Sequence, residues 1–331
     1  MKAAIIGLHG PELTPEESAL LQAYPPAGVI LFGRNIEGPL PLARLVGDVR
    51  EVLPPGAVLM VDQEGGRVAR LRPPDWRAHP TAASIGELYE IHAPSGLRLA
   101  WLTGALIGLD CAEAGFDVVC APVLDLHSEG MTDAIGDRSY GANPRHVAAL
   151  GQSMADGLLS AGVQPVGKHA PGHGPAQVDS HKALPRIGAD VNLEPDISVF
   201  EQSAGLPWMM TAHIVYAGID PERPATLSPS VIDRLIRHGI GFEGVLVSDD
   251  LAMGALSGPV GERAAAAVAA GCDLALHCSG RLADTEAVLK AAPDVTAATR
   301  RRMARAREMA DRCRLQLDWH ALAADQDAMF A

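Results

Sequence analysis

Eight short runs rich in Val, Ile and Leu recur along the chain, with helical or irregular stretches between them. Continuous apolar runs of this kind are typical of parallel strands that are buried on both faces of a sheet. Eight strand–helix units in 331 residues predict a (β/α)8 TIM barrel. A doubly wound open sheet is the alternative, since strand counting from one sequence is error-prone. The expected strands are residues 3–8, 28–32, 58–61, 118–121, 164–167, 208–212, 245–248 and 274–277.

The segments between these runs carry helix signals. Thr14 can cap a helix that begins at Pro15, and Glu16 and Glu17 would then lie in its first turn. Further helices are predicted over residues 97–114, 144–161, 229–239 and 262–270. No linker divides the sequence, so we expect one domain over residues 1–331, with 315–331 as a peripheral C-terminal tail.

Charge and cysteine content limit the partners and the compartment. A formal net charge of −13 argues against nucleic acid as a partner, and we interpret the basic run 300–307 as a solvated surface helix. The longest run of small apolar residues, 264–272, is half a membrane span, so no membrane association is expected. Five cysteines without CxxC spacing, and an N-terminus that turns acidic too soon for a signal peptide, predict a cytoplasmic protein.

The densest cluster of ionisable residues is Lys168-His169-Ala170-Pro171-Gly172-His173-Gly174, followed by Asp179-Ser180-His181. Its prolines and glycines exclude a helix, so we predict a loop that leaves the strand at 164–167. Asp179 is close enough to His181 for its carboxylate to hydrogen-bond the imidazole. Such a partner orients the ring and favours its protonated form, which suits a general acid/base. A satisfied loop histidine beside a turn-forming aspartate is the alternative, and the density of ionisable groups argues against it.

Polar clusters follow five of the expected strands. The carboxyl ends of the strands of a TIM barrel meet at one face, where active sites are assembled. One aspartate there is most often a helix cap or a turn residue, but five clusters at the same end predict a site. The clusters are Asp62-Gln63-Glu64-Gly65-Gly66-Arg67 with Arg70, Asp125 with Gly136-Asp137-Arg138-Ser139, Lys168-His169, His213, and Ser248-Asp249-Asp250.

The residue types in these clusters favour carbohydrate chemistry. Carboxylates, cations and histidines would surround the pocket, and sugars need such partners around their hydroxyl groups. No Gly-rich phosphate loop follows the first strand, and Gly65-Gly66 lacks the spacing of a dinucleotide-binding turn. Glycoside hydrolysis with retention needs a nucleophile on one side of the anomeric carbon and a proton donor on the other.

With these clusters in view, the sequence resembles the bacterial β-N-acetylhexosaminidases of glycoside hydrolase family 3, cytoplasmic enzymes of cell-wall recycling. The resemblance extends from near residue 5 to about residue 280. It is carried by the cluster at 168–174 with 179–181, by Val61-Asp62-Gln63-Glu64-Gly65-Gly66-Arg67-Val68, by Gly136-Asp137-Arg138-Ser139, by Met210-Thr211-Ala212-His213-Ile214-Val215, by Val247-Ser248-Asp249-Asp250-Leu251, and by Gly28-Val29-Ile30-Leu31-Phe32-Gly33-Arg34-Asn35-Ile36.

The resemblance implies one barrel domain that needs no metal or organic cofactor. By its position in the Ser-Asp-Asp motif, Asp249 matches the nucleophile that forms a covalent glycosyl-enzyme. His181, paired with Asp179, matches the general acid/base. We expect a monomer whose substrate is a small carbohydrate, a muropeptide fragment or a chito-oligosaccharide with non-reducing N-acetylglucosamine. The residues that match those holding this sugar are Asp62, Arg70, Arg138, Lys168 and His169.

This chemistry places demands on individual side chains. Asp249 should work ionised, with Lys168 or Arg138 near enough to keep its pKa low. His181 replaces the second carboxylate of the usual scheme, so Asp179 becomes necessary to polarise it. His173 and His213 fit the family motifs too, and we interpret them as structural or supporting.

The motif after the expected nucleophile departs from the family. The chain reads Leu251-Ala252-Met253-Gly254-Ala255-Leu256, where the family more often has a serine before the methionine and an extra residue after it. This difference bears on loop packing near Asp249.

Other chemistries remain open from the sequence. Lys168 as a Schiff-base lysine fits its neighbours less well. A metal-dependent hydrolase would use His169, His173, His213 and Asp249, although Pro171-Gly172 prevents the helical spacing that such histidines often use. A phosphorylase is a closer rival, because a histidine acid/base would not repel an incoming phosphate. A non-catalytic sugar-binding protein is the last alternative.

Overall fold

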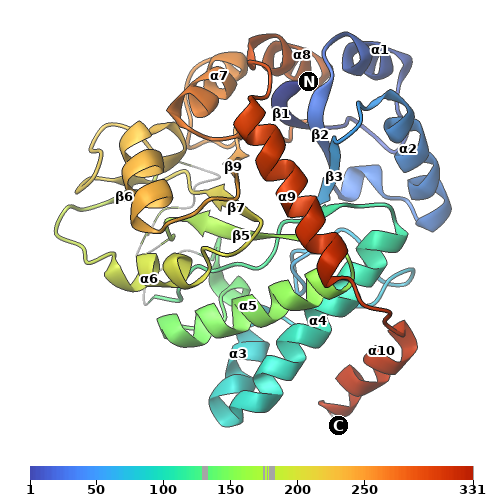
Figure 1. Ribbon diagram of the computed structural model, residues 1–331, viewed down its shortest axis with the longest axis vertical. Helices are drawn as coiled ribbons and strands as arrows, with labels where there is room; N and C mark the ends of the chain where they lie inside the picture. The colour runs from blue at the N-terminus through green and yellow to red at the C-terminus, as the bar shows by residue number, and fades with distance from the viewer. Residues whose placement is uncertain (129–132, 174–175, 177, 179–182, 331) are drawn as a thin grey trace.

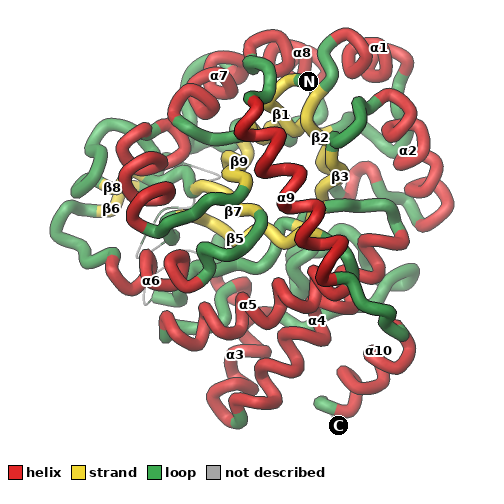
Figure 2. Tube along the Cα trace, viewed as in Figure 1, coloured by secondary structure: helices red, strands yellow, loops and turns green. Residues whose placement is uncertain are grey.

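The protein is described here by a computed structural model, which covers residues 1–128, 133–173, 176, 178 and 183–330. Eight parallel strands form a closed barrel in the order β1-β10-β9-β7-β5-β4-β3-β2, with helices around it (Figures 1 and 2). Every barrel strand coincides with a predicted run, so the TIM barrel is confirmed and the open sheet is wrong. The strands are β1 (Lys2–Gly7), β2 (Pro26–Leu31), β3 (Val58–Val61), β4 (Val118–Val119), β5 (Gln164–Ala170), β7 (Trp208–Thr211), β9 (Val245–Asp250) and β10 (Leu274–His277).

Alternate residues of each strand pack into two different cores. Ile5 and Met60 point into the barrel, where Trp208 is fully buried and donates from Nε1 to Gln164 Oε1 at 2.8 Å. Ile6 points the other way, into the layer between the strands and the helices. Because both faces are covered, the strands need apolar residues at successive positions, which explains the continuous runs in the sequence.

The helices begin and end close to the predicted signals. Thr14 and Glu17 form a capping box at the start of the first helix, and Gly271, with φ of 119°, ends the Ala-rich helix after β9. The helix expected from residue 97 begins earlier, at Ala93. The helices are α1 (Pro15–Ala23), α2 (Pro39–Val52), α3 (Ala82–Ile91), α4 (Ala93–Glu113), α5 (Pro144–Ser160), α6 (Glu194–Gln202), the π-helical η4 (Ser230–Gly239), α7 (Val260–Ala270), α8 (Leu282–Ala291), α9 (Ala297–Cys313) and α10 (Trp319–Ala328), with short 3-10 turns η1 (Gly33–Asn35), η2 (Gly136–Arg138) and η3 (Ala225–Leu227).

Strand β5 is longer than predicted. It continues through Lys168 and His169 to Ala170, because Lys168 pairs with Met210 and Ala170 with Thr211 of β7. The two residues therefore lie in the strand and not in the loop that we expected from residue 168. Asp179 and His181, which we predicted for the following loop, lie outside the described residues. A small sheet that the sequence did not predict, β6 (Arg186–Ile187) with β8 (Val215–Tyr216), lies outside the barrel.

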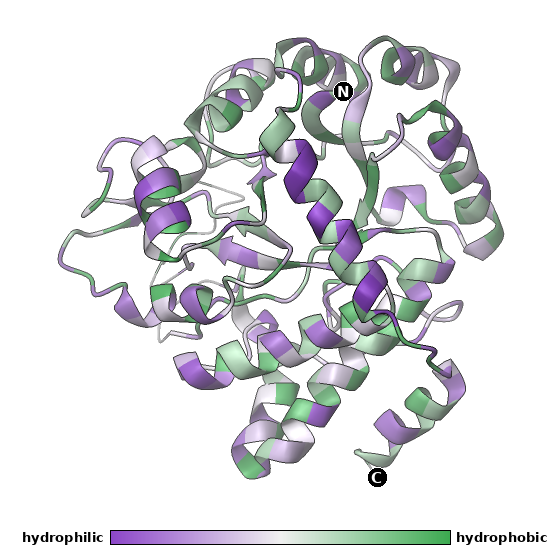
Figure 3. Cartoon of the chain, in the orientation of Figure 1, coloured by the Kyte–Doolittle hydropathy of each residue, from purple (hydrophilic) through white to green (hydrophobic). Residues whose placement is uncertain are grey.

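Helix α9 covers the end of the barrel where the strands begin. Its Arg302 and Thr299 both hydrogen-bond Asp273, one residue before β10, while Met303 packs into the barrel core. Figure 1 shows α9 running across the front of the strands, and Figure 3 shows hydrophilic bands along it. The interpretation of 300–307 as a solvated helix holds for one face only, because every third or fourth residue is buried.

The C-terminal segment packs on helix α4. Trp319 Nε1 donates to Asp110 at 2.8 Å, and Gln326 Nε2 donates to Thr103 at 3.0 Å. Figure 1 shows α10 beside the lower end of α4, away from the strands. Among the described helices, none is both long and apolar enough to cross a membrane.

Candidate active site

A cavity of about 500 Å³ lies at the carboxyl ends of the barrel strands, opposite α9. Its lining brings together every predicted site residue that the structure describes. These residues come from β5, from β9 and from the loops after β3 and β4, so segments up to 187 positions apart in sequence (249 − 62) meet in one pocket. They are Asp62, Arg70, Arg138, Lys168, His169 and Asp249, with His173 and His213 beside them.

The loop after β3 supplies two carboxylates to this cavity. Asp62 and Glu64 both line it, while Gln63 between them is buried and accepts at Oε1 from the backbone N–H of Arg70. Gly65 has φ of 97°, and a Cβ atom there would lie 2.6 Å from the carbonyl oxygen of Pro80. Only glycine fits this turn, which returns the chain so that Arg70 can reach Asp62.

Alternating charges then connect the pocket side chains. Arg70 Nη2 lies 3.2 Å from Asp62 Oδ2, and Lys168 Nζ lies 3.0 Å from Asp62 Oδ1. Lys168 Nζ also lies 2.6 Å from Glu64 Oε1, and Arg138 contacts both Glu64 oxygens at 2.8 Å. We call Arg70–Asp62–Lys168–Glu64–Arg138 the charge chain.

The charge chain fixes the ionisation of its members. Burial alone would lower the pKa of Lys168, but the carboxylates of Asp62 and Glu64 outweigh it and raise that pKa. Burial would raise the pKa of Glu64, yet Arg138 and Lys168 bring it down to about 2. Lys168 is therefore a permanent cation, whereas a Schiff-base lysine must be neutral to attack a carbonyl group. This observation counts against the Schiff-base alternative.

Asp125 positions the end of β5. Its side chain is fully buried, with Oδ2 2.7 Å from His169 Nδ1 and Oδ1 accepting from the backbone N–H groups of His169 and His173. Burial would raise the pKa of this carboxyl, but His169 and these hydrogen bonds lower it to about 2. Because an ionised carboxylate only accepts, Nδ1 of His169 carries a hydrogen and Nε2 is the nitrogen left for the pocket.

Asp249 and Asp250 have different surroundings. Asp250 Oδ1 accepts from the backbone N–H groups of Ala252 and Cys278, both at 2.9 Å, so this carboxylate holds the loops after β9 and β10. Asp249 accepts one backbone N–H, from Asp250 at 2.7 Å, and both aspartates line the cavity. Because the Asp250 carboxylate is engaged in holding these two loops, Asp249 is favoured as the reacting carboxylate.

The environment of Asp249 keeps it ionised. Burial would raise its pKa, but His169, His213, the Asp250 N–H and Lys168 outweigh burial and lower that pKa. The Lys168 cation and the Asp250 N–H contribute to this lowering whatever the charge of the two histidines, and burial lowers the pKa of His213 itself. Lys168 therefore acts on Asp249 in the direction that the sequence analysis expected.

His213 supports the backbone next to Asp249. Its Nε2 lies 2.9 Å from the carbonyl oxygen of Asp250, which can only accept, so Nε2 carries the hydrogen. Its Nδ1 lies 2.8 Å from Thr226 Oγ1. These contacts use both ring nitrogens of His213, and Asp125 engages Nδ1 of His169. Within the described part of the chain, no group of three or more His, Cys, Asp or Glu side chains is arranged to hold a metal ion.

Two carboxylates, Glu64 in the cavity lining and the buried Asp125 behind His169, have no role assigned from the sequence. Glu64 and Asp125 were noted within the strand-end clusters, but neither was assigned to the site. Glu64 stands two positions after Asp62, so the alternation of a strand continued past its end could have indicated that both point into the pocket. For Asp125 the only sequence signal is its place after β4, because its partners are 44 and 48 residues away.

Comparison with known proteins is consistent with this fold. The sequence profile of the glycosyl hydrolase family 3 N-terminal domain matches residues 4–314. The β-hexosaminidase of Alkalilimnicola ehrlichii is 40% identical over 296 residues, which is 88% of this chain and 84% of that protein. The β-hexosaminidase of Thioalkalivibrio sulfidiphilus is 41% identical over 282 residues, 83% of this chain and 80% of its own. The crystal structure of NagZ from Neisseria gonorrhoeae in complex with N-trifluoroacetyl-D-glucosamine is 30% identical, with a TM-score of 0.87, covering 99% of this chain and 97% of that one.

Proposed function

The chain belongs to glycosyl hydrolase family 3, and we propose that it is a retaining exo-β-N-acetylglucosaminidase that removes non-reducing terminal N-acetylglucosamine from muropeptide fragments. The observation that carries the proposal is the cavity in which Asp249 lies beside the charge chain. Its relatives are named β-hexosaminidases, and glycoside hydrolysis is their reaction. The proposal adds the sugar, the stereochemical course and the natural substrate.

We propose a reaction in two displacements. The Asp249 carboxylate attacks the anomeric carbon as the bond to the leaving oxygen breaks, and His181 gives that oxygen its proton. Water then attacks the same carbon, His181 takes the proton from water, and the carboxylate of Asp249 is released. His181 and Asp179 lie outside the described residues, so their roles rest on the family motif alone.

The charge chain suits a neutral, hydroxyl-rich ligand. Asp62 and Lys168 present an acceptor and a donor side by side, and Arg70 and Arg138 add donors on either side of them. Each charge is already paired with an opposite one, so an uncharged sugar can replace water around these groups without leaving an isolated charge. This pairing supports Asp62, Arg70, Arg138 and Lys168 as residues that hold N-acetylglucosamine, and His169 lines the same cavity with its Nδ1 turned to Asp125.

The first test is release of 4-nitrophenol from its β-N-acetylglucosaminide, with and without a chelator. We expect turnover that the chelator leaves unchanged. Turnover abolished by the chelator and restored by metal would favour the metal-dependent alternative. No turnover on this activated substrate would overturn the proposed activity and favour a sugar-binding protein.

The acceptor is tested by product analysis in phosphate buffer. We expect free N-acetylglucosamine, because the arginine and lysine side chains that line the described pocket, Arg67, Arg70, Arg138 and Lys168, are each within 3.2 Å of a carboxylate oxygen, which would repel an incoming phosphate. Formation of the sugar 1-phosphate would make the enzyme a phosphorylase instead.

The role of His181 is tested by leaving-group dependence. His181→Ala should slow the hydrolysis of poor leaving groups most and of activated aryl glycosides least, because a good leaving group needs little help from an acid. Equal losses on both kinds of substrate would count against His181 as the proton donor.

A further inference from the structure

We infer that Glu64 is a positioning residue, whose carboxylate holds Lys168 and Arg138 in the arrangement that binds the sugar without contacting the sugar itself. The inference rests on the proposed function, since it concerns the same pocket. It gives a role to Glu64, for which neither the family motifs nor the two-step reaction supplied one.

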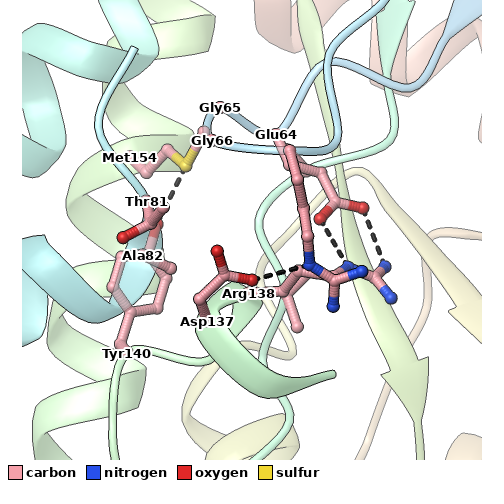
Figure 4. A pocket seen from close by; sticks show the side chains of 12 residues that line it. Glu64, Gly65, Gly66, Thr81, Ala82, Asp137, Arg138, Tyr140 and Met154 are labelled. Atoms are coloured by element: carbon pink, nitrogen blue, oxygen red, sulfur yellow. Dashed lines mark hydrogen bonds and ion pairs between the residues drawn. The ribbon is translucent and has the colours of Figure 1, made fainter. Parts of the chain in front are cut away.

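Both carboxylate oxygens of Glu64 are already engaged. Oε1 lies 2.6 Å from Lys168 Nζ and 2.8 Å from Arg138 Nη2, while Oε2 lies 2.8 Å from Arg138 Nε. Figure 4 shows the two parallel contacts between Glu64 and Arg138. The Glu64 side chain is only 7% exposed, whereas that of Asp62 is 19% exposed. Glu64 therefore offers little free acceptor surface to a ligand. Its hydrogen bonds and ion pairs are made with Lys168 and Arg138.

The backbone and the packing fix where the carboxylate lies. The Glu64 N–H donates to the Val68 carbonyl oxygen at 2.8 Å, across the turn that contains Gly65. Behind the side chain, a cavity of about 10 Å³ lined by Thr81, Tyr140 and others leaves room for about one water molecule. The Tyr140 hydroxyl is itself turned to Met154 Sδ (Figure 4). Toward the larger cavity, the contacts with Lys168 and Arg138 hold the Glu64 carboxylate in place.

Glu64 is also needed for charge balance. The charge chain contains three cations and two carboxylates, and Glu64 stands between Lys168 and Arg138. Without its charge, Lys168 keeps Asp62 as its carboxylate partner, and Arg138 keeps the carbonyl oxygen of Ala134. The two cations would then repel one another in a buried site, and both would move from the positions that face the sugar.

The test compares Glu64→Gln and Glu64→Asp with the wild-type enzyme. Glutamine keeps the shape but turns an amide N–H2 toward a cation, while aspartate keeps the charge on a shorter side chain. Asp273→Asn is the matched control, because Asp273 is a buried carboxylate with two arginine partners, Arg237 and Arg302, at the opposite end of the barrel. For each protein we would measure KM and kcat on the aryl β-N-acetylglucosaminide, the Kd for N-acetylglucosamine, and unfolding in urea.

We expect Glu64→Gln to raise KM and the Kd for N-acetylglucosamine together, by about tenfold or more, with a smaller change in kcat. Glu64→Asp should recover part of this loss, and Asp273→Asn should lose stability without a change in KM. An unchanged KM in Glu64→Gln, or no recovery in Glu64→Asp, would overturn the role of Glu64.

The same variants also cover a Glu64→Gln protein that does not fold and a wild-type enzyme that has no activity. If Glu64→Gln does not fold, Glu64→Asp decides, and a wild-type KM and Kd in that variant would overturn the inference. A wild-type enzyme that neither turns over the glycoside nor binds N-acetylglucosamine would overturn the proposed function itself. If the wild-type enzyme is active and Glu64→Gln has the wild-type KM and Kd, only the positioning role of Glu64 is excluded.

Discussion

At the residue scale, two adjacent aspartates do different work because their hydrogen-bond partners differ. Both aspartates line the cavity, but Asp250 uses Oδ1 to hold two loops and burial raises its pKa, whereas the pKa of Asp249 is lowered. A lowered pKa means that Asp249 stays ionised as the pH falls below the ordinary range of an aspartate. This direction suits the proposed role of Asp249 as a nucleophile, which must be ionised to attack.

Asp249→Ala should abolish turnover, because the neighbouring carboxylate of Asp250 is held by the backbone N–H groups of Ala252 and Cys278. The loss expected is at least about 10³-fold in kcat on the aryl glycoside. Binding of N-acetylglucosamine should persist in this variant, since the charge chain is intact. Residual turnover close to that of the wild type would exclude Asp249 as the nucleophile.

Asp125→Asn should destabilise the protein in a pH-dependent way. The pKa of Asp125 is lowered to about 2 from an ordinary 3.8. Its contribution is present above the unfolded value and is lost as the pH falls from 3.8 toward 2. Urea unfolding should show a loss on the order of 2 kcal/mol at neutral pH that shrinks below pH 3.8. An equal loss of stability at neutral pH and below pH 3.8 would mean that the charge of Asp125 is not the cause.

At the element scale, the helix that sequence reasoning treated as solvated closes one end of the barrel. Met303 on α9 packs against the strand core, and Arg302 and Thr299 share Asp273. The strand ends that carry chemistry lie at the other end. The packing against α9 and the proposed active site therefore lie at opposite ends of the same strands.

Met303→Ala should lower the free energy of unfolding by about 2 kcal/mol or more, because it removes buried side-chain volume from a packed core. Arg301→Ala, two positions earlier on the exposed face of α9, should change it by less than about 0.5 kcal/mol. Urea unfolding measures both, and KM should stay at the wild-type value in both. Equal effects would mean that α9 is not packed into the barrel.

The strands could be predicted from sequence, and several contacts could not. Each barrel strand is a local apolar run, so its existence is visible along the chain. The extension of β5 through Lys168 and His169 depends on pairing with β7, which no local pattern shows. Glu64 and Asp125 depend on partners far away in sequence, so the contacts that they make with Lys168, Arg138 and His169 could be identified only from the fold.

At the scale of the whole molecule, the site exists only when the barrel is closed. Its residues come from β5, β9 and the loops after β3 and β4, and the C-terminal helix α10 packs against α4 away from the strands. We propose that the chain behaves as one domain, in which the strands and α10 unfold together.

Unfolding in urea should show coincident transitions by far-UV circular dichroism and tryptophan fluorescence. Trp208 lies in the barrel core and Trp319 on α10, so the fluorescence signal reports on both regions. Trp319→Phe, which loses the hydrogen bond to Asp110, provides the comparison. An early fluorescence step that disappears in Trp319→Phe would mean that the C-terminal segment melts separately.

The charge chain also has a consequence for the response to salt. The molecule carries a formal net charge of −13, yet the charges at the pocket floor are paired with one another over 2.6–3.2 Å. Counter-ions screen charges separated by more than about 8 Å at physiological ionic strength, and hardly affect buried contacts this short. For an uncharged glycoside, kcat/KM should therefore vary by less than about twofold between dilute buffer and physiological salt. Each charge at the pocket floor already has an oppositely charged side chain beside it, so ions from the solution add little.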